Sequence, residues 1–464
     1  MTITDVSTAA RLGGSKGPGQ DASASSATRE AGSPSPSKGT LFRFATAGSV
    51  DDGKSTLVGR LLHDAKAILA DQLDQVQAVS RQRGFAHGDF DFALLTDGLR
   101  AEREQGITID VAYRYFATDR RSFILADCPG HVQYTRNMVT GSATADAVVV
   151  LVDARNGIVE QTRRHLAVVS LLRVPHVIIA VNKIDLIGFD EDGFRDIERE
   201  ALAVADQLGL RDAHVLPVSA LEGDNIVERS ERTPWYDGDT LIGLLETRPG
   251  ADESDAATSP LRLPVQLVLR PQGGLSPEVR SPERYRDFRG FAGRIASGQV
   301  AVGDRVEVFP GGHTTIVTGI LVAGERAEAA VATQSVAVTL AHQLDVARGA
   351  VIVAAGTLPA GRREAVVELF QLDAREVIAG SKVLAKHGTA TVQALIVEVL
   401  DRRDLETLAH EPAAVLAVNE IGRVRLRFAA DLPLVPYTTD RAGGSLVLIH
   451  PGDGATLAAA TVVD

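Results

Sequence analysis

A glycine-rich stretch near the N-terminus has the residue types and the spacing of a phosphate-binding loop. It reads GSVDDGKS and matches the pattern G-x-x-x-x-G-K-[ST], with Gly48 and Gly53 as its glycines. Small residues there let backbone N–H groups converge on a phosphate, and the positive end of a following helix adds to the attraction. Lys54 would supply a charge for the β- and γ-phosphates, and Ser55 a hydroxyl ligand for Mg²⁺. The predicted nucleotide-binding residues here are Gly48, Ser49, Val50, Asp51, Asp52, Gly53, Lys54, Ser55 and Thr56.

The motif NKID, which begins at Asn182, favours guanine as the base. Guanine offers N1–H and its 2-amino group as a pair of donors, and the carboxylate of Asp185 can accept both. Adenine lacks the 2-amino group and would leave that carboxylate half-paired, a loss that can reach about 10⁴-fold. Asn182 can serve the opposite edge of the base and tie the loop down, while Lys183 can lay its stem along the ring. Because the phosphate loop alone does not separate ATP from GTP, this motif carries the prediction of GTP.

A third segment, VSAL, follows another strand-like pattern and ends at Leu221. The backbone N–H of Ala220 can meet guanine O6, and Ser219 can brace the turn. We therefore expect Ser219, Ala220 and Leu221 to complete the pocket for the base.

Two further segments have the residues needed to respond to the γ-phosphate. DCPGH begins at Asp127, which can reach Mg²⁺ through a water, and the N–H of Gly130, after Pro129, can bond the γ-phosphate. His131 could orient the attacking water, although a lone histidine is more often an ordinary surface residue. Upstream, EQGITID offers Thr108 as a second hydroxyl ligand of Mg²⁺. The predicted catalytic residues are His131, Lys54 and Thr108, and the predicted metal ligands are Ser55, Thr108 and Asp127.

These motifs need a scaffold that brings several strand ends together. Residues 41–250 alternate short β-branched apolar runs with helix-like patterns, which predicts a doubly wound parallel sheet with its ligand crevice at the carboxyl ends of the strands. Beyond an acidic break at 251–260, repeated strands and glycine-bearing turns predict two barrels that divide near 354–361. The predicted fold is therefore an α/β P-loop GTPase domain followed by two antiparallel β-barrel domains.

The expected domain bounds follow from these changes in pattern. Residues 1–39 are rich in Ser, Ala, Gly and Pro and are expected to be a disordered tail, with a partner-binding arm as the alternative. The GTP-binding domain is expected at 40–255, and the two barrels at 256–355 and 356–464.

Composition narrows the partners and the compartment. The formal net charge of -12 argues against broad binding to nucleic acid or to an anionic membrane. No apolar run is long enough to span a bilayer. A single cysteine, Cys128, excludes an intrachain disulfide and suits a reducing compartment. We therefore expect a cytoplasmic protein with no nucleic-acid and no membrane partner.

Taken together, VDDGKST, QGITI, DCPGH, NKID and VSAL resemble the motifs of translation-factor-class GTPases over residues 41–464. Within that class the chain is similar to the GTPase subunit of bacterial sulfate adenylyltransferase in long stretches such as GSVDDGKSTLVGRLLHD and LLTDGLRAEREQGITIDVAYRYF. The alternative is the elongation factor that delivers aminoacyl-tRNA, which usually has VDHGK and RGITI where this chain has Asp52 and Gln105. A stand-alone kinase or ATPase is a second alternative. One departure from the sulfate family is the final IHPGDGATLAAATVVD, which leaves the contacts of the last strand open.

The resemblance implies a division of labour between two subunits. The small catalytic subunit of sulfate adenylyltransferase would hold the ATP and sulfate site and form adenosine 5'-phosphosulfate and pyrophosphate. This chain would bind and hydrolyse GTP with Mg²⁺ and thereby pull that uphill reaction forward. In the wider class an acidic residue at the position of Asp51 can help to bind a monovalent cation, and a carboxylate that only braces the loop is the equal alternative. Some relatives append an adenylylsulfate kinase domain with its own phosphate loop; none is found here, so that activity is expected to be absent.

Overall fold

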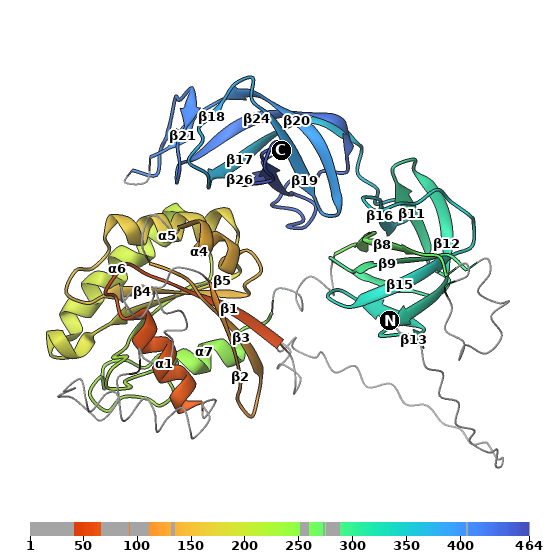
Figure 1. The fold of residues 1–464 in the computed structure, drawn as a ribbon. Helices are drawn as coiled ribbons and strands as arrows, with labels where there is room; N and C mark the ends of the chain where they lie inside the picture. The colour runs from red at the N-terminus through yellow and green to blue at the C-terminus, as the bar shows by residue number, and fades with distance from the viewer. Residues whose placement is uncertain are drawn as a thin grey trace, which may run out of the picture.

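The computed structural model describes residues 41–65, 92, 111–130, 135–250, 259–271, 274, 288–404 and 407–463 of the chain. These residues form an α/β unit followed by two β-rich units, which we call the first, second and third units (Figure 1). Among the helices of these ranges, none is long and apolar enough to cross a membrane.

The first unit is built on a six-stranded sheet. Its strands are β1 (Leu41–Ala47), β2 (Ala112–Ala117), β3 (Ser122–Asp127), β4 (Ala147–Asp153), β5 (His176–Asn182) and β6 (Ala213–Pro217). Their order across the sheet is β2-β3-β1-β4-β5-β6, with β2 antiparallel to β3 and the other neighbours parallel. β4 and β5 are buried at every residue, as continuous apolar runs in a parallel sheet predict.

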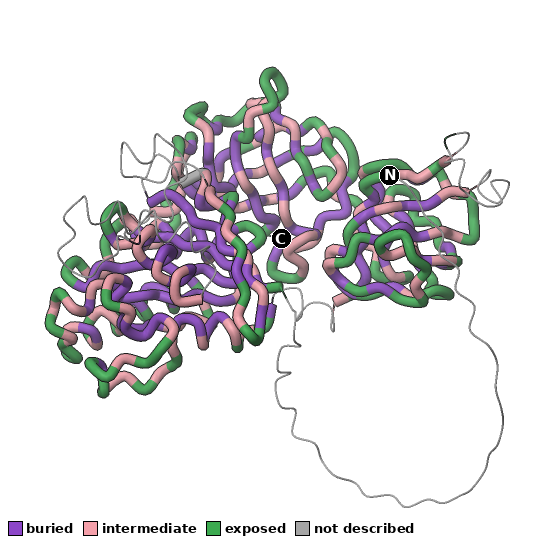
Figure 2. Tube along the Cα trace, turned by 60° about the horizontal axis from the view of Figure 1, so that its bottom comes forward, coloured by how far each residue is buried: buried purple, intermediate pink, exposed green. Residues whose placement is uncertain are grey.

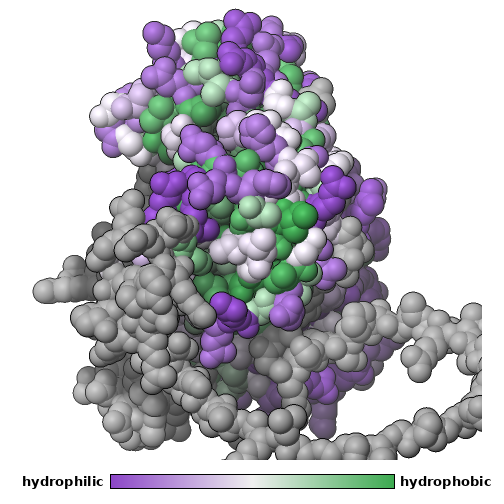
Figure 3. All heavy atoms as spheres, turned by 90° about the vertical axis from the view of Figure 1, so that its right-hand side faces the viewer, coloured by the Kyte–Doolittle hydropathy of each residue, from purple (hydrophilic) through white to green (hydrophobic). Residues whose placement is uncertain are grey.

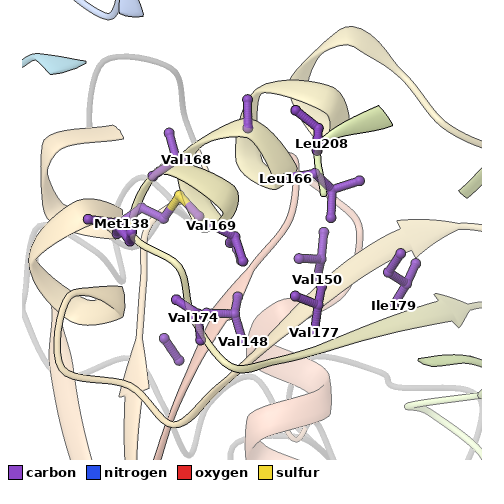
Figure 4. Packing of buried hydrophobic residues seen from close by; sticks show 14 of the residues in the cluster. Met138, Val148, Val150, Leu166, Val168, Val169, Val174, Val177, Ile179 and Leu208 are labelled. Carbon is purple, nitrogen blue, oxygen red and sulfur yellow. The ribbon is translucent and has the colours of Figure 1, made fainter. Parts of the chain in front are cut away.

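Helices cover both faces of this sheet. They are α1 (Lys54–Asp64), α4 (Thr135–Ser142), α5 (Glu160–Leu171), α6 (Glu191–Gln207), α7 (Leu241–Thr247) and the short 3-10 helix Ile184–Ile187. Alternate side chains of β4 separate two cores: Val149 and Leu151 pack with α1 and α7, whereas Val148 and Val150 pack with α4, α5 and α6. Figure 4 shows Val148 and Val150 below the side chains that α5 directs at the sheet.

Five strands bring their last residues to one edge of the sheet. β1, β3, β4, β5 and β6 end at Ala47, Asp127, Asp153, Asn182 and Pro217. Because parallel strands share a direction, the segments that follow them meet at this edge, where ligands bind in open α/β sheets. The topology therefore brings the phosphate loop and the motifs DCPGH, NKID and VSAL to the same edge of the sheet.

The second unit is an antiparallel sheet whose two ends come together. The strands of this sheet are β7 (Arg262–Pro264), β8 (Leu267–Leu269), β9 (Gly290–Arg294), β11 (Arg305–Phe309), β12 (His313–Val322), β15 (Ser335–Leu340) and β16 (Val351–Ala354), with β13 (Glu325–Ala327) paired to β12. β10 (Gln299–Ala301) and β14 (Ala329–Val331) form a separate two-stranded sheet. The order β7-β16-β11-β12-β15-β9-β8 puts β7 and β8 at opposite ends, although they are consecutive in the chain. Between them, Val265 N–H donates to Ala350 and Gln266 N–H to Ala292, each at 2.8 Å. The sheet must therefore curl round on itself, as in a barrel.

The third unit is a closed barrel in the order β17-β24-β20-β19-β25-β26. Its strands, with the short pairs beside the barrel, are β17 (Arg362–Gln371), β18 (Val377–Ile378), β19 (Lys382–His387), β20 (Ala390–Val399), β21 (Arg402–Arg403), β22 (His410–Glu411), β23 (Val415–Leu416), β24 (Ile421–Leu432), β25 (Ser445–Ile449) and β26 (Thr456–Val462). The atypical last strand β26 pairs with both β17 and β25, and its Ala458 and Ala460 join the barrel core. This last strand therefore closes the barrel.

The third unit packs against the first. Phe370, Leu372 and Ile421 join the core cluster under α4, α5 and α6. The Tyr437 hydroxyl donates to the carbonyl of Leu172, at the end of α5, over 2.6 Å. Figure 2 shows that buried residues follow the strands of all three units and that exposed residues lie mainly in the turns.

The second unit is joined to the third by an ion pair between Arg262 and Asp440, at 2.7 Å. On the side of the second unit turned away from the first, apolar and polar side chains are interspersed (Figure 3). Leu267, Ile316 and Val331 of this unit are exposed apolar residues.

Candidate nucleotide site

The loop between β1 and α1 is organised around the buried ammonium of Lys54. Its Nζ donates to the carbonyls of Gly48, at 2.9 Å, and Ser49, at 2.7 Å. Burial lowers the pKa of Lys54, and the carboxylates of Asp127 and Asp52 oppose that shift. The Lys54 side chain is thus held by two backbone carbonyls of the loop, for which phosphate oxygens would compete.

Asp52 fixes the start of this loop. Its Oδ2 accepts from the backbone N–H of Ser49 at 2.5 Å, and the residue is only 6% exposed. Burial raises the pKa of Asp52 above its ordinary value, while the Ser49 N–H and the charge of Lys54 pull the pKa down. The carboxylate braces the loop from inside, which the sequence analysis did not foresee.

Two glycines keep the loop open to a ligand. Gly53 has φ +90°, and a Cβ there would collide with the amide nitrogen of Asn182. A Cβ on Gly130 would collide with Lys54 Nζ and the carbonyl of Gly48. Beside them, the hydroxyl of Ser49 is buried and has no hydrogen-bond partner among the described residues. The loop therefore forms a cradle with a free polar atom, and this fits the predicted phosphate ligand.

Asn182 connects the phosphate loop to the predicted base loop. Its Nδ2 donates to the carbonyl of Asp52 at 2.7 Å, and its Oδ1 accepts from the N–H of Ala220 at 2.9 Å. The motif VSAL predicts that this N–H meets guanine O6; in this structure it donates to Asn182 Oδ1. Next to it, the Ser219 hydroxyl donates to Asp185 Oδ1 at 2.6 Å. Ser219 thus holds the carboxylate that we expect to recognise guanine.

Lys183 lies across the phosphate loop. It has φ +62°, and its Nζ donates to the carbonyl of Asp51 and to Asp153 Oδ2, the latter at 2.9 Å. Asp153 ends β4 and also accepts from Arg155 at 3.0 and 2.6 Å. Burial alone would raise the pKa of Asp153, but the hydrogen bonds from Arg155 and Lys183 outweigh it and hold that pKa below its ordinary value. Asp153 fixes the direction of the Lys183 stem.

The predicted metal ligands divide between the described and the undescribed parts of the chain. Asp127 is 2% exposed at the end of β3, and its Oδ1 accepts from the Thr46 hydroxyl at 2.8 Å. Ser55 lies in the first turn of α1, directly after Lys54. Carboxylate and hydroxyl oxygens are ligands that suit Mg²⁺. Thr108 and His131 lie outside the described residues.

The other predicted residues take their places around the same loop. Val50 and Asp51 are exposed at its tip, Thr56 is half-buried in α1, and Pro129 is buried beside Gly130. Leu221, expected in the pocket for the base, offers its carbonyl to Arg60 of α1 at 3.1 Å.

Comparison with known proteins identifies the class. Residues 40–254 match the elongation factor Tu GTP binding domain, and residues 362–463 match the GTP-eEF1A C-terminal domain-like family. The chain is therefore a P-loop GTPase of the class that includes the translation factors, with β-rich domains after the GTP-binding domain.

Whole-chain relatives narrow the class to one family. Sulfate adenylyltransferase subunit 1 of Chromobacterium violaceum is 46% identical, over 91% of this chain and 86% of that protein. The same subunit of Bacteroides fragilis is 44% identical, again over 91% and 86%. The chain belongs to the family of sulfate adenylyltransferase subunit 1. It is also 44% identical to the bifunctional enzyme CysN/CysC of Rhodopirellula baltica, of whose length it spans 64%.

Proposed function

We propose that this chain is the GTP-hydrolysing subunit of a sulfate adenylyltransferase. Its GTP hydrolysis would drive a partner subunit that forms adenosine 5'-phosphosulfate and pyrophosphate from ATP and sulfate. The observation that carries the proposal is the identity of 44–46% over 91% of the chain to relatives named subunit 1 of that enzyme. Because these relatives are named as one subunit of an enzyme, we infer a partner subunit, to which we assign the ATP and sulfate site. The single cysteine of this chain, Cys128, is buried and reduced, which suits a protein of the cytoplasm.

In this function the two ends of GTP are held by different loops. Lys54 exchanges the carbonyls of the loop for β- and γ-phosphate oxygens, and Gly130 leaves room for its own N–H to approach the γ-phosphate. Asp185, oriented by Ser219, accepts from the guanine N1–H and 2-amino group. Asn182 fixes the distance between the two loops.

Ser55 and Asp127 would hold Mg²⁺, together with Thr108, which lies outside the described residues. The ion neutralises charge on the phosphate oxygens when it is bound. Asp127 suits this role because it is kept in place by Thr46 and is shielded from bulk water.

Hydrolysis needs a positioned water, and we assign that task to His131. GTPases that lack a partner are slow, on the order of 10⁻⁴ to 10⁻² s⁻¹, because nothing fixes the water or completes the charge clamp. We therefore expect slow turnover by this chain alone and strong stimulation by the partner subunit with ATP and sulfate. Full-rate GTP hydrolysis by the isolated chain would contradict the proposal.

Two experiments test the proposal at its two levels. Calorimetry with Mg²⁺ should show tight binding of GTP and none of ATP; a preference for ATP would leave a kinase or ATPase. Co-purification with the small subunit, followed by a pyrophosphate-release assay with ATP and sulfate, should then show release that depends on GTP.

The class of the fold leaves one alternative, an elongation factor that carries aminoacyl-tRNA. Filter binding of charged tRNA to the GTP form separates the two functions. We expect no retention, and retention together with GTP-independent pyrophosphate release would favour the elongation factor.

A further inference from the structure

Arg60 links the helix that starts at the phosphate loop to the loop that holds the base. It lies in α1, and its Nη1 donates to the carbonyl of Leu221 at 3.1 Å. Its Nε donates to Asp64 Oδ2, one turn further along α1, at 2.7 Å. The guanidinium also lies over the ring of Phe92, at 5.2 Å from the centroid. These contacts fix one side chain on α1 and direct its free end at the base loop.

The base loop is shaped to receive this guanidinium. Gly223 has φ +93°, and a Cβ there would collide with Nη2 of Arg60. The N–H of Gly223 donates to the carbonyl of Ser219 at 2.7 Å, so residues 219–223 form a turn closed by its own hydrogen bond. The positive φ favours glycine at this position, and a larger residue would also displace the guanidinium of Arg60.

This turn is packed on one side and open on the other: Ala220 belongs to the hydrophobic core, whereas Glu222 and Gly223 border a cavity. A cavity of about 700 Å³ lies between α1 and the segment that follows the base loop. It is lined by Arg60, His63 and Asp64 of α1 and by residues 222–224 and 227–231. On the open side, packing contributes little to the position of the turn, and the hydrogen bond from Arg60 to the carbonyl of Leu221 helps to hold it. On the opposite side of the turn, the N–H of Ala220 donates to Asn182 Oδ1.

From these contacts we infer that Arg60 is a positioning residue for guanine recognition. This inference rests on the proposed binding of GTP. Arg60 holds Leu221, the turn carries Ser219, and the Ser219 hydroxyl aims the carboxylate of Asp185 at the 2-amino group. Loss of Arg60 frees the turn and with it the carboxylate, while the phosphate cradle around Lys54 stays in place.

The experiment compares GDP with IDP, which lacks the 2-amino group, in competition binding to the full chain with Mg²⁺. For Arg60→Met we expect the IDP-to-GDP ratio of Kd values to fall by about 5- to 10-fold, because the lost contact is the one that IDP never makes; tenfold corresponds to about 1.4 kcal/mol. Arg60→Lys, which keeps the charge but not the fork, should fall in between. Gly223→Ala should shift the ratio in the same direction.

The matched control is Arg163→Met. Arg163 lies in α5, pairs with Glu200 at 2.8 Å and is 23% exposed, against 22% for Arg60, but the described structure gives it no link to the base loop. It should leave the ratio unchanged. If Arg60→Met weakens GDP and IDP equally, or changes neither, the inference is wrong. If the unaltered chain itself does not prefer GDP to IDP, the proposed function fails instead.

Discussion

Asn182 shows how one side chain can serve two loops. Its amide nitrogen and oxygen each have a buried partner, one in the phosphate loop and one in the base loop. An aspartate would lack the donor for Asp52, and a shorter residue would reach neither loop. The motif NKID predicted that this residue ties the base loop down, and the structure shows the two partners of its amide, Asp52 and Ala220.

Replacing Asn182 with Ala should therefore weaken both folding and binding. The change leaves the Ala220 N–H and the Asp52 carbonyl without their partner, and each buried unpaired group costs about 1–3 kcal/mol. We expect lower stability in urea unfolding and a GDP affinity reduced by about tenfold or more. Asn225→Ala is the control, since Asn225 makes buried bonds to Pro217 and Thr233, both at 2.9 Å. It should lose similar stability with little loss of affinity.

Asp185→Asn should change the preferred base. An amide in place of the carboxylate cannot accept from both guanine donors, but it can donate to the 2-oxo group of xanthine. We expect GDP affinity to fall by about 10² to 10⁴ and XDP affinity to rise, measured by competition binding. Unchanged GDP affinity would show that Asp185 does not contact the base.

At the scale of elements, α5 contains a buried titratable group. His165 of α5 is 1% exposed, and within the described part of the chain its Nδ1 has no hydrogen-bond partner. Burial, with the charges of Lys54 and Arg164, lowers the pKa of His165 to about 3. The packed position of α5 therefore requires that the imidazole of His165 is neutral.

This arrangement makes stability fall as the pH drops. Below pH 6.5 the unfolded chain takes up a proton at His165, while the folded chain does not until about pH 3, so protons favour unfolding within that window. The slope is up to about 1.4 kcal/mol per pH unit. Urea unfolding at pH 7, 6 and 5 should show a shallower dependence for His165→Gln than for the unaltered chain. Equal slopes would mean that His165 titrates normally.

At the scale of the whole molecule, the first and third units share a hydrophobic core and a buried hydrogen bond. The Tyr437 hydroxyl and the Arg441 guanidinium both donate to the carbonyl of Leu172, at 2.6 and 3.1 Å. Because Leu172 directly follows the last residue of α5, these bonds attach the third unit to the C-terminal end of the helix that contains His165.

Tyr437→Phe should loosen this contact without unfolding either unit. It removes a bond worth about 1 kcal/mol, while Arg441 still satisfies the Leu172 carbonyl. We expect faster protease cleavage in the connection at residues 355–361. Tyr236→Phe is the control, because its hydroxyl bonds Asp239 within the first unit. Cleavage at an unchanged rate would show that the hydroxyl does not hold the units together.

The sequence predicted the site where its residues are close together in the chain. The loop at residues 48–55 and the motif NKID are local patterns, and the alternation of elements placed them at one sheet edge. Asp153 escaped notice because it ends an ordinary apolar strand; its role follows from the β4–β5 register, which pairs Asp153 with Asn182. Arg60 and Leu221 are 161 residues apart, and Tyr437 and Leu172 are 265 apart, so no periodic pattern could reveal either contact.

The shared core also bears on how the GTPase unit can be handled by itself. Phe370, Leu372 and Ile421 lie more than a hundred residues beyond α7, yet they belong to the same buried hydrophobic cluster as residues of α4 and α5. A fragment that ends at residue 355 lacks these three residues and exposes the apolar surface that they cover. It should therefore aggregate or bind detergent, whereas the intact chain should not.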